Sequence, residues 1–166
     1  MAPRPNALAW LALSLLVVGL DQLTKHVALL ELRPYEPHAV IPGLLNWTLA
    51  FNPGAAFSFL AGESGWQRWL FTALAIGVSA LLATWLARLP RGDWRNALPL
   101  SLIIGGALGN LIDRLRFGHV TDFVQVYWGD WSFPAFNVAD SAISIGAVLL
   151  VVFGFLLGGK AAAKGG

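Results

Sequence analysis

The sequence predicts an all-α membrane protein with four transmembrane helices and a small β-sheet at its outer face. The first observation is composition: 57% of the 166 residues are hydrophobic and only 12% are charged, whereas a soluble domain carries about 25% charged residues. The second is that four apolar stretches each reach the roughly 20 residues that a helix needs to cross a bilayer. The third is that two of the connections between them are rich in β-branched and aromatic residues.

The predicted spans cover residues 7–30, 66–89, 97–115 and 139–158. The whole chain, 1–166, is then one membrane domain. Arg4 precedes the first span as it would precede a signal peptide, but no small-x-small cleavage site follows. We therefore expect this span to be retained, with a cleaved signal as the alternative. In the third span, Gly105 and Gly109 have the spacing that permits close packing of helices, and we interpret them as packing residues.

Basic residues predict the orientation of the spans. With four crossings, six basic residues fall on one side: Arg4, Arg88, Arg91, Arg95, Lys160 and Lys164. The positive-inside rule makes that side cytoplasmic. Both termini are then inside, and the segments 31–65 and 116–138 face outward.

The outer segments contain the predicted sheet. Asn-Pro-Gly at residues 52–54 is typical of a turn, and the apolar runs around it predict a hairpin of residues 45–51 and 55–60. The run HVTDFVQVYW, residues 119–128, predicts another strand because of its β-branched and aromatic residues. Such a sheet would rest at the membrane surface and shelter what lies beneath it.

Several chemistries are excluded by composition. The chain has no cysteine, which excludes disulfides, thiolate catalysis and thiolate metal sites. His26, His38 and His119 lack the spacing of zinc ligands, so we expect no metal and no cofactor. The basic residues form no stripe, so we expect no nucleic-acid partner.

Polar residues gather at the outer ends of the predicted spans and in the outer segments. They are Asp21, Gln22, Lys25, Asn52, Asn110, Asp113, Arg114, Asp122, Asn137 and Asp140. Polar residues at membrane depth are costly, and they face a bundle interior or mark a functional site. Asp21 and Lys25 lie four residues apart and can neutralise each other, which is the role we favour for this pair. Asp113 can pair with any of three cations: Arg114, Arg116 or Lys25.

Two acids point to catalysis. Asn137 can cap the fourth span, and Asp140 can interact with its dipole in the first turn. Capping does not explain Asp122, which lies in an apolar, strand-like run. Two carboxylates held close cannot both ionise cheaply, so one keeps its proton while the other acts as a base towards water, as in aspartic proteases. We therefore predict that Asp122 and Asp140 form a water-activating pair, which His119, expected at the surface, could tune.

Five blocks of sequence resemble, in order and spacing, the motifs of the lipoprotein signal peptidase family, also called signal peptidase II. The blocks are DQLTK (21–25), NPGAAFSF (52–59), GGALGNLIDR (105–114), HVTDF (119–123) and FNVADS (136–141). The four-span layout extends the resemblance over almost the whole chain. Thr121, where the family more often has an aliphatic residue, and Pro53, after the turn asparagine, are small departures.

The resemblance implies an aspartic endopeptidase of the bacterial inner membrane, with its site at the periplasmic face under a β-cradle. Such enzymes remove the signal peptide from prolipoproteins that carry diacylglycerol on a cysteine, cutting just before that cysteine. By motif match, Asp122 and Asp140 are the catalytic pair. The residues that would bind substrate are Asn52, Asn110, Arg114 and Asn137. Those that would support the site are Asp21, Lys25 and Asp113.

The implied partners are the diacylglyceryl prolipoprotein, membrane lipid and the cyclic peptide inhibitor globomycin, and we expect a monomer. From the residues alone, the alternative is a small proton-coupled transporter or channel that uses Asp21, Asp122 and Asp140 as a relay. A purely structural membrane subunit is a third possibility. The acids lie in one outer layer and do not step through the membrane, which argues against transport.

Overall fold

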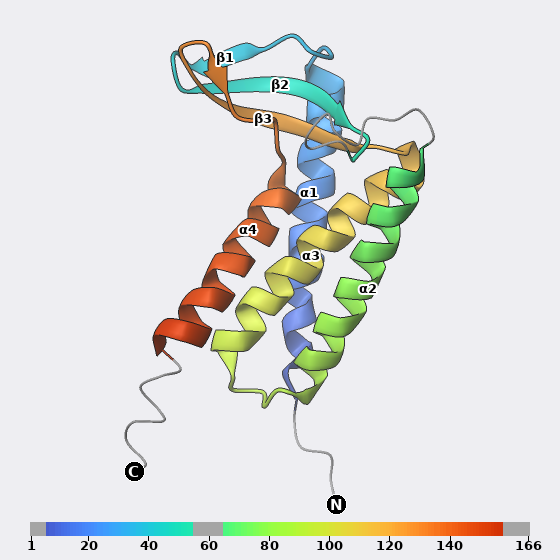
Figure 1. Ribbon diagram of the computed structural model, residues 1–166, viewed down its shortest axis with the longest axis vertical. Coiled ribbons are helices and arrows are strands. Elements are labelled where there is room, and N and C mark those ends of the chain that lie inside the picture. The colour runs from blue at the N-terminus through green and yellow to red at the C-terminus, as the bar shows by residue number, and fades with distance from the viewer. Residues whose placement is uncertain (1–5, 55–64, 158–166) are drawn as a thin grey trace, which may run out of the picture.

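The computed structural model describes residues 6–54 and 65–157. In these segments the helices stand side by side and a small antiparallel sheet lies across one end of the bundle (Figure 1). The helical elements are η1 Ala7–Trp10, α1 Leu11–Glu31, α2 Trp66–Arg88, α3 Trp94–Phe117, α4 Val138–Val151 and the π-helical η3 Val152–Leu157.

Three helical segments are long and apolar enough to cross a membrane: Ala7–Glu31, Trp66–Arg88 and Trp94–Phe117. They confirm the first three predicted spans, with ends that differ by at most three residues. The last apolar helix, Val138–Gly154, is shorter. A helical membrane protein is therefore shown, and the fourth crossing stays a prediction.

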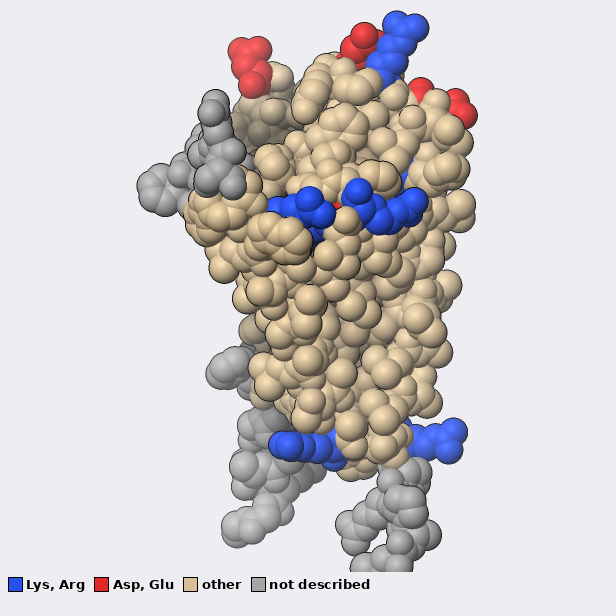
Figure 2. Space-filling view, turned by 90° about the vertical axis from the view of Figure 1, so that its right-hand side faces the viewer, with Lys and Arg blue, Asp and Glu red and all other residues tan. Residues whose placement is uncertain are grey.

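Charged side chains lie at separate levels of the bundle on the face shown in Figure 2. Lys and Arg form one belt at the end opposite the sheet and a second belt nearer the sheet, and the surface between the belts shows no charged side chain. The connection between α2 and α3, where Arg91 lies, is at the end opposite the sheet (Figure 1). An uncharged surface between two basic belts is what a bilayer requires.

Glycines let the helices approach α3 closely. A Cβ on Gly105 would lie 2.8 Å from the carbonyl oxygen of Ser14 on α1. A Cβ on Gly106 would overlap the backbone of Ala139 on α4. The interpretation of Gly105 as a packing residue is confirmed, because neither position has room for a side chain.

The sheet has the order β1–β2–β3–β4, and all its pairings are antiparallel. Its strands are β1 His38–Ile41, β2 Leu45–Asn52, β3 Val120–Trp128 and β4 Trp131–Ser132. The long pairing joins β2 to β3, with Asn52 opposite Val120 and Ala50 opposite Asp122. This register places the end of β2 beside the acid of β3.

β3 confirms the strand predicted over 119–128, and β2 confirms the first half of the predicted hairpin. The second half, 55–60, lies outside the described residues. β2 pairs with β1 on one edge and with β3 on the other. β1 is a short strand of exposed residues that the sequence does not predict.

Candidate active site

The first turn of α4 holds Asp140 in a fixed position. Asn137 is the N-cap, and its Oδ1 accepts a hydrogen bond of 2.9 Å from the backbone N–H of Asp140. In return the carboxylate of Asp140 accepts a 3.2 Å hydrogen bond from the backbone N–H of Asn137. This reciprocal capping box confirms the predicted cap and directs the half-buried Asp140 towards the sheet end of the bundle.

Asp122 comes to the same place from β3. Its side chain is 2% exposed, and its Oδ1 accepts a 2.7 Å hydrogen bond from Nδ2 of Asn137. Asn110, on α3, donates a 2.7 Å hydrogen bond from Nδ2 to Oδ1 of Asp140. The two amides also bind each other, over 3.1 Å from Nδ2 of Asn137 to Oδ1 of Asn110. Two asparagines therefore join acids that come from separate elements.

The surroundings of Asp122 favour its neutral form. Burial and, after it, the charge of Asp140 raise the pKa of Asp122 from 3.8 to about 7. The side-chain amides of Asn137 and Asn52 act in the opposite direction. Near neutral pH, Asp122 can therefore hold a proton while its neighbour carries a charge.

A buried ammonium group neutralises two more acids beneath this pair. The Nζ of Lys25, a residue 3% exposed, lies 2.8 Å from Asp21 Oδ2 and 3.1 Å from Asp113 Oδ2. It also donates a 2.9 Å hydrogen bond to Oδ1 of Asn110. The predicted Asp21–Lys25 pair is confirmed, and of the three cations considered for Asp113 the structure selects Lys25.

Asp21 and Asp113 also hold the backbone of β3, which carries Asp122, and of α4, which carries Asp140. Oδ1 of Asp21 accepts a 2.9 Å hydrogen bond from the backbone N–H of Ala139, next to Asp140. Oδ2 of Asp113 accepts one of 2.9 Å from the backbone N–H of Thr121, next to Asp122. The same pair of acids therefore positions both α4 and β3.

Gln22 also belongs to this network, in a role that the sequence does not predict. Its Nε2 donates hydrogen bonds of 2.9 Å to Asp113 Oδ1, 3.2 Å to the carbonyl of Gly109 and 3.3 Å to Asp21 Oδ2. Its position beside Asp21, in a polar run at membrane depth, is the feature of the sequence that could have indicated this role.

Asn52 and Asp140 border one cavity. Asn52 ends β2, and its Oδ1 accepts a 2.9 Å hydrogen bond from the backbone N–H of Gly54, which fixes the turn. The cavity, of about 670 Å³, lies between this turn, segment 133–136 and one face of α4. Asp140 is therefore open to a space that can admit a ligand.

Arg114 and Asp140 border a second, smaller cavity between α2, α3 and α4. It has a volume of about 240 Å³, and Asn110 also lines it. The guanidinium of Arg114 lies over the ring of Phe71 at 5.3 Å, and its Nη1 is 3.5 Å from the carbonyl oxygen of Asn110. Because Asp113 pairs with Lys25 and not with Arg114, the guanidinium of Arg114 is left to line the cavity.

His119 was expected at the surface, but it is half-buried. Its ring packs against Phe51 at 4.6 Å and Phe117 at 6.0 Å between centroids. Any effect on the acids stays a prediction. Among the residues that the structure describes, no group of three or more His, Asp or Glu side chains could hold a metal ion.

Known proteins resemble this chain over most of its length. A family model described as signal peptidase (SPase) II matches residues 13–156. The lipoprotein signal peptidase of Xanthomonas campestris pv. campestris (strain 8004) is 56% identical over 164 residues, which cover 99% of this chain and 98% of that protein. The protein of the same name from Xanthomonas euvesicatoria pv. vesicatoria (strain 85-10) is 59% identical over 152 residues, which cover 92% and 88%.

Solved structures show the same fold. One, described as a bacterial membrane enzyme, has a TM-score of 0.79 and 30% identity, and the match covers 95% of this chain and 93% of that one. Another of the same description has a TM-score of 0.75 and 31% identity, with coverages of 89% and 92%. None of these matches supports a transporter or channel. Since the family model and these relatives match most of its length, the chain belongs to the signal peptidase II family, that of the lipoprotein signal peptidases.

Proposed function

We propose that the protein is an aspartic endopeptidase that removes the signal peptide from diacylglyceryl-modified prolipoproteins, cutting just before the lipidated cysteine. The family supplies the substrate class. The observation that carries the aspartic mechanism is the pair of acids, Asp122 from β3 and Asp140 from α4, whose carboxylates both accept hydrogen bonds from Asn137, one from its Nδ2 and one from its backbone N–H. Asp140 also borders both cavities, so a peptide bond can reach it.

The two acids divide the chemistry between them. Asp122, with its raised pKa, keeps a proton and donates it in a hydrogen bond to the oxygen of the scissile carbonyl. Asp140 is the base: it takes a proton from a water molecule, and the water oxygen bonds to the carbonyl carbon. The proton then passes from Asp140 to the leaving nitrogen as the C–N bond breaks. Asn110 and the backbone N–H of Asn137 donate hydrogen bonds to the carboxylate of Asp140 and hold it in place.

The cavity walls suit the two parts of this substrate. Arg114 and Asn52 place hydrogen-bonding groups beside Asp140, where they can hold backbone carbonyls near the cut. Apart from Asn110, Arg114 and Asp140, the smaller cavity is apolar, and Leu74 and Val78 of α2 and Ile143 of α4 line it. That wall suits the hydrophobic segment of a signal peptide. A globomycin-type inhibitor would compete for the same space.

The orientation is part of the proposal. Four crossings would place both termini in the cytoplasm, and the active site at the periplasmic face of the inner membrane, in a monomer. The support is the basic α2–α3 connection at the end opposite the sheet. Because the chain has no native cysteine, Gly92→Cys should react with an impermeant thiol reagent only from the cytoplasm, and Asp130→Cys only from the periplasm. The reverse pattern would contradict this orientation.

The test of function is cleavage of a lipidated prolipoprotein in proteoliposomes. Asp122→Asn and Asp140→Asn should each lower the initial rate by about 10²–10⁴-fold or more, since general acid–base catalysis has that magnitude. The double variant should be scarcely slower than either single one, because the acids act as a unit. Asp130→Asn, at an exposed turn, is the matched control and should keep the wild-type rate. If Asp122→Asn or Asp140→Asn cleaves at close to the wild-type rate, the two-aspartate mechanism is excluded.

A further inference from the structure

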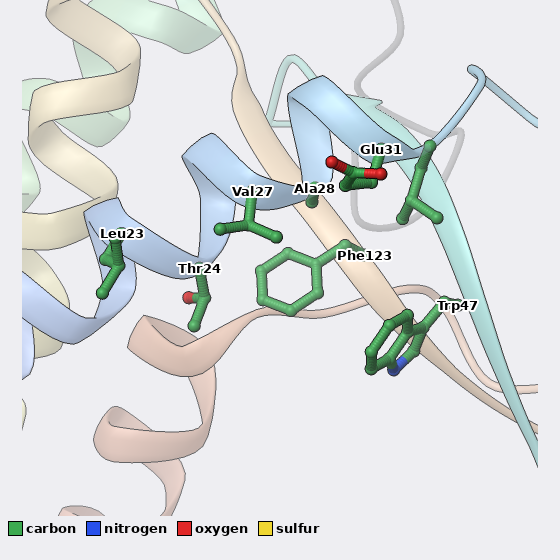
Figure 3. A pocket seen from close by; sticks show the side chains of 8 residues that line it. Leu23, Thr24, Val27, Ala28, Glu31, Trp47 and Phe123 are labelled. Atoms are coloured by element: carbon green, nitrogen blue, oxygen red, sulfur yellow. The ribbon is translucent and has the colours of Figure 1, made fainter.

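A narrow pocket opens on the lipid-facing side of α1, beneath the sheet. Its volume is about 270 Å³, and it shares no lining residue with the two cavities at Asp140. Figure 3 shows the last turns of α1 on one side, with Phe123 of β3 and Trp47 of β2 on the other. Asp122 and Phe123 are consecutive in β3, so their side chains point to opposite faces of the strand.

The pocket is apolar and continuous with the membrane-facing surface. Leu23 and Val27, which line it, are 59% and 49% exposed on a helix apolar enough to span the bilayer. The hydroxyl of Thr24 donates to the carbonyl oxygens of Leu20 and Asp21 in its own helix, at 2.8 and 3.0 Å. It therefore adds no free donor to the pocket. Such a slot, open to the bilayer, suits an acyl chain better than water or a polar ligand.

One charged side chain, Glu31, lies at the edge of the pocket, and its carboxylate is destabilised there unless a cation is near. Glu31 lines the pocket in the last turn of α1, which contains no basic residue. The carboxyl end of a helix carries partial negative charge, so an acid there is destabilised. Within residues 6–54 and 65–157 Glu31 makes no ion pair, and its side chain is exposed. It also marks the outer end of the span Ala7–Glu31, the level at which lipid headgroups lie.

We propose that this pocket binds an aminophospholipid of the outer leaflet, with one acyl chain along α1 and the ammonium of the headgroup at Glu31. The chain fills the slot between Val27 and Phe123. The ammonium supplies the cation that the last turn of α1 lacks. Trp47, 51% exposed, closes the rim with an amphipathic ring of the kind that favours the membrane interface. The site is independent of peptide cleavage, and a lipid with an anionic headgroup would be repelled there.

The test counts lipids that stay bound to the full-length protein. The protein is reconstituted with equal amounts of phosphatidylethanolamine and phosphatidylglycerol, extracted in mild detergent, and analysed by native mass spectrometry. The wild type should retain phosphatidylethanolamine over phosphatidylglycerol by about two- to fivefold, the ratio expected of one exposed ion pair. Glu31→Gln should abolish this preference. Glu36→Gln, a nearby exposed acid that does not line the pocket, should keep it.

A second pair of variants tests the acyl-chain slot. Val27→Trp should fill the pocket and remove one retained lipid. Leu30→Trp adds the same ring to the same end of α1 outside the pocket, where Leu30 is 68% exposed, and should leave the count unchanged. The proposal is overturned if Val27→Trp retains lipid as the wild type does, if both tryptophan variants lose it equally, or if Glu31→Gln keeps the headgroup preference.

Discussion

Asn137 donates a hydrogen bond of 2.7 Å from Nδ2 to Oδ1 of Asp122, although the Oδ1 of Asn137 is already engaged in capping α4. One side chain therefore has a structural role at the helix and a positioning role at the acid. Serine is also a good N-cap, but it has no amide to reach Asp122. Asn137→Ser retains the cap but loses the buried hydrogen bonds that Nδ2 donates, so it should lower the stability of the protein by about 1–3 kcal/mol. It should lower kcat/KM by about 10–100-fold, the size of a lost hydrogen bond to an ionisable group.

Asn137→Ala is the control for this separation, since it removes the cap as well. Its melting temperature should fall below that of Asn137→Ser, while the loss of kcat/KM should be similar. Thermal unfolding in detergent and cleavage rates, measured on the same preparations, distinguish the two effects. If Asn137→Ser cleaves at the wild-type rate, the bond to Asp122 has no catalytic importance.

Lys25 should be essential for stability, because it is the cation between two buried acids. Lys25→Met would leave Asp21 and Asp113 buried without their ion pair at 2.8 and 3.1 Å. Breaking a buried pair in this way costs about 3–5 kcal/mol. Adding Asp113→Asn to Lys25→Met should recover part of that loss, since one unpaired charge is removed. Thermal unfolding of the three proteins measures this, and a double variant that is less stable than Lys25→Met would contradict it.

Gly109 and Gly77 provide a matched test of packing against α3. A Cβ on Gly109 would lie 2.6 Å from Oδ2 of Asp21, whereas a Cβ on Gly77 of α2 meets nothing within 4 Å. Gly109→Ala should therefore destabilise the protein by about 1–3 kcal/mol through overpacking. Gly77→Ala should be neutral or stabilising, by up to about 1 kcal/mol, because alanine favours the helix. Equal effects of the two substitutions on the melting temperature would show that Asp21 can move aside.

The helices were predictable from the sequence, and part of the sheet was not. A transmembrane helix satisfies its own backbone, so apolar length alone identifies it. The prediction succeeded for Ala7–Glu31, Trp66–Arg88 and Trp94–Phe117. β1, by contrast, has only the residues His38–Ile41, all exposed. It is a strand because β2 pairs with it, and a four-residue pattern does not reveal a partner.

The residues of the site were predictable from the sequence, but the contacts between their side chains were not, because those contacts depend on the tertiary structure. Membrane depth grouped the polar residues, the position of Asp122 in an apolar strand pointed to its pairing with Asp140, and the family resemblance gave the same two acids. Spacing could not tell whether Asp113 pairs with Lys25, which is 88 residues away, or with an arginine beside it. The choice depends on the face of α3 that meets α1, which the close contact of Gly105 with Ser14 determines. The bridge from Asn137 to Asp122 likewise exists only once β3 crosses α4.

The raised pKa of Asp122 predicts a pH-dependent stability that can be measured apart from catalysis. Folding raises this pKa from 3.8 to about 7. Between these values the folded protein binds a proton that the unfolded chain has lost, so stability falls as pH rises. Below pH 3.8 Asp122 is protonated in both the folded and the unfolded state, and it does not change the free energy of unfolding. Above pH 7 it lowers that free energy by its full amount, at most about 4 kcal/mol for a shift of about three pH units at 1.36 kcal/mol each.

Asp122→Asn removes the titrating group and should remove this dependence. Its melting temperature in detergent should match that of the wild type, apart from a constant offset, near pH 4. The difference should grow in favour of the variant at pH 6 and be largest at pH 8, although the variant no longer cleaves prolipoprotein. Asp130→Asn, the exposed control, should follow the wild type at every pH. A difference between Asp122→Asn and the wild type that stays constant from pH 4 to pH 8 would mean that Asp122 is already ionised in the folded protein, and that it cannot be the acid that polarises the carbonyl.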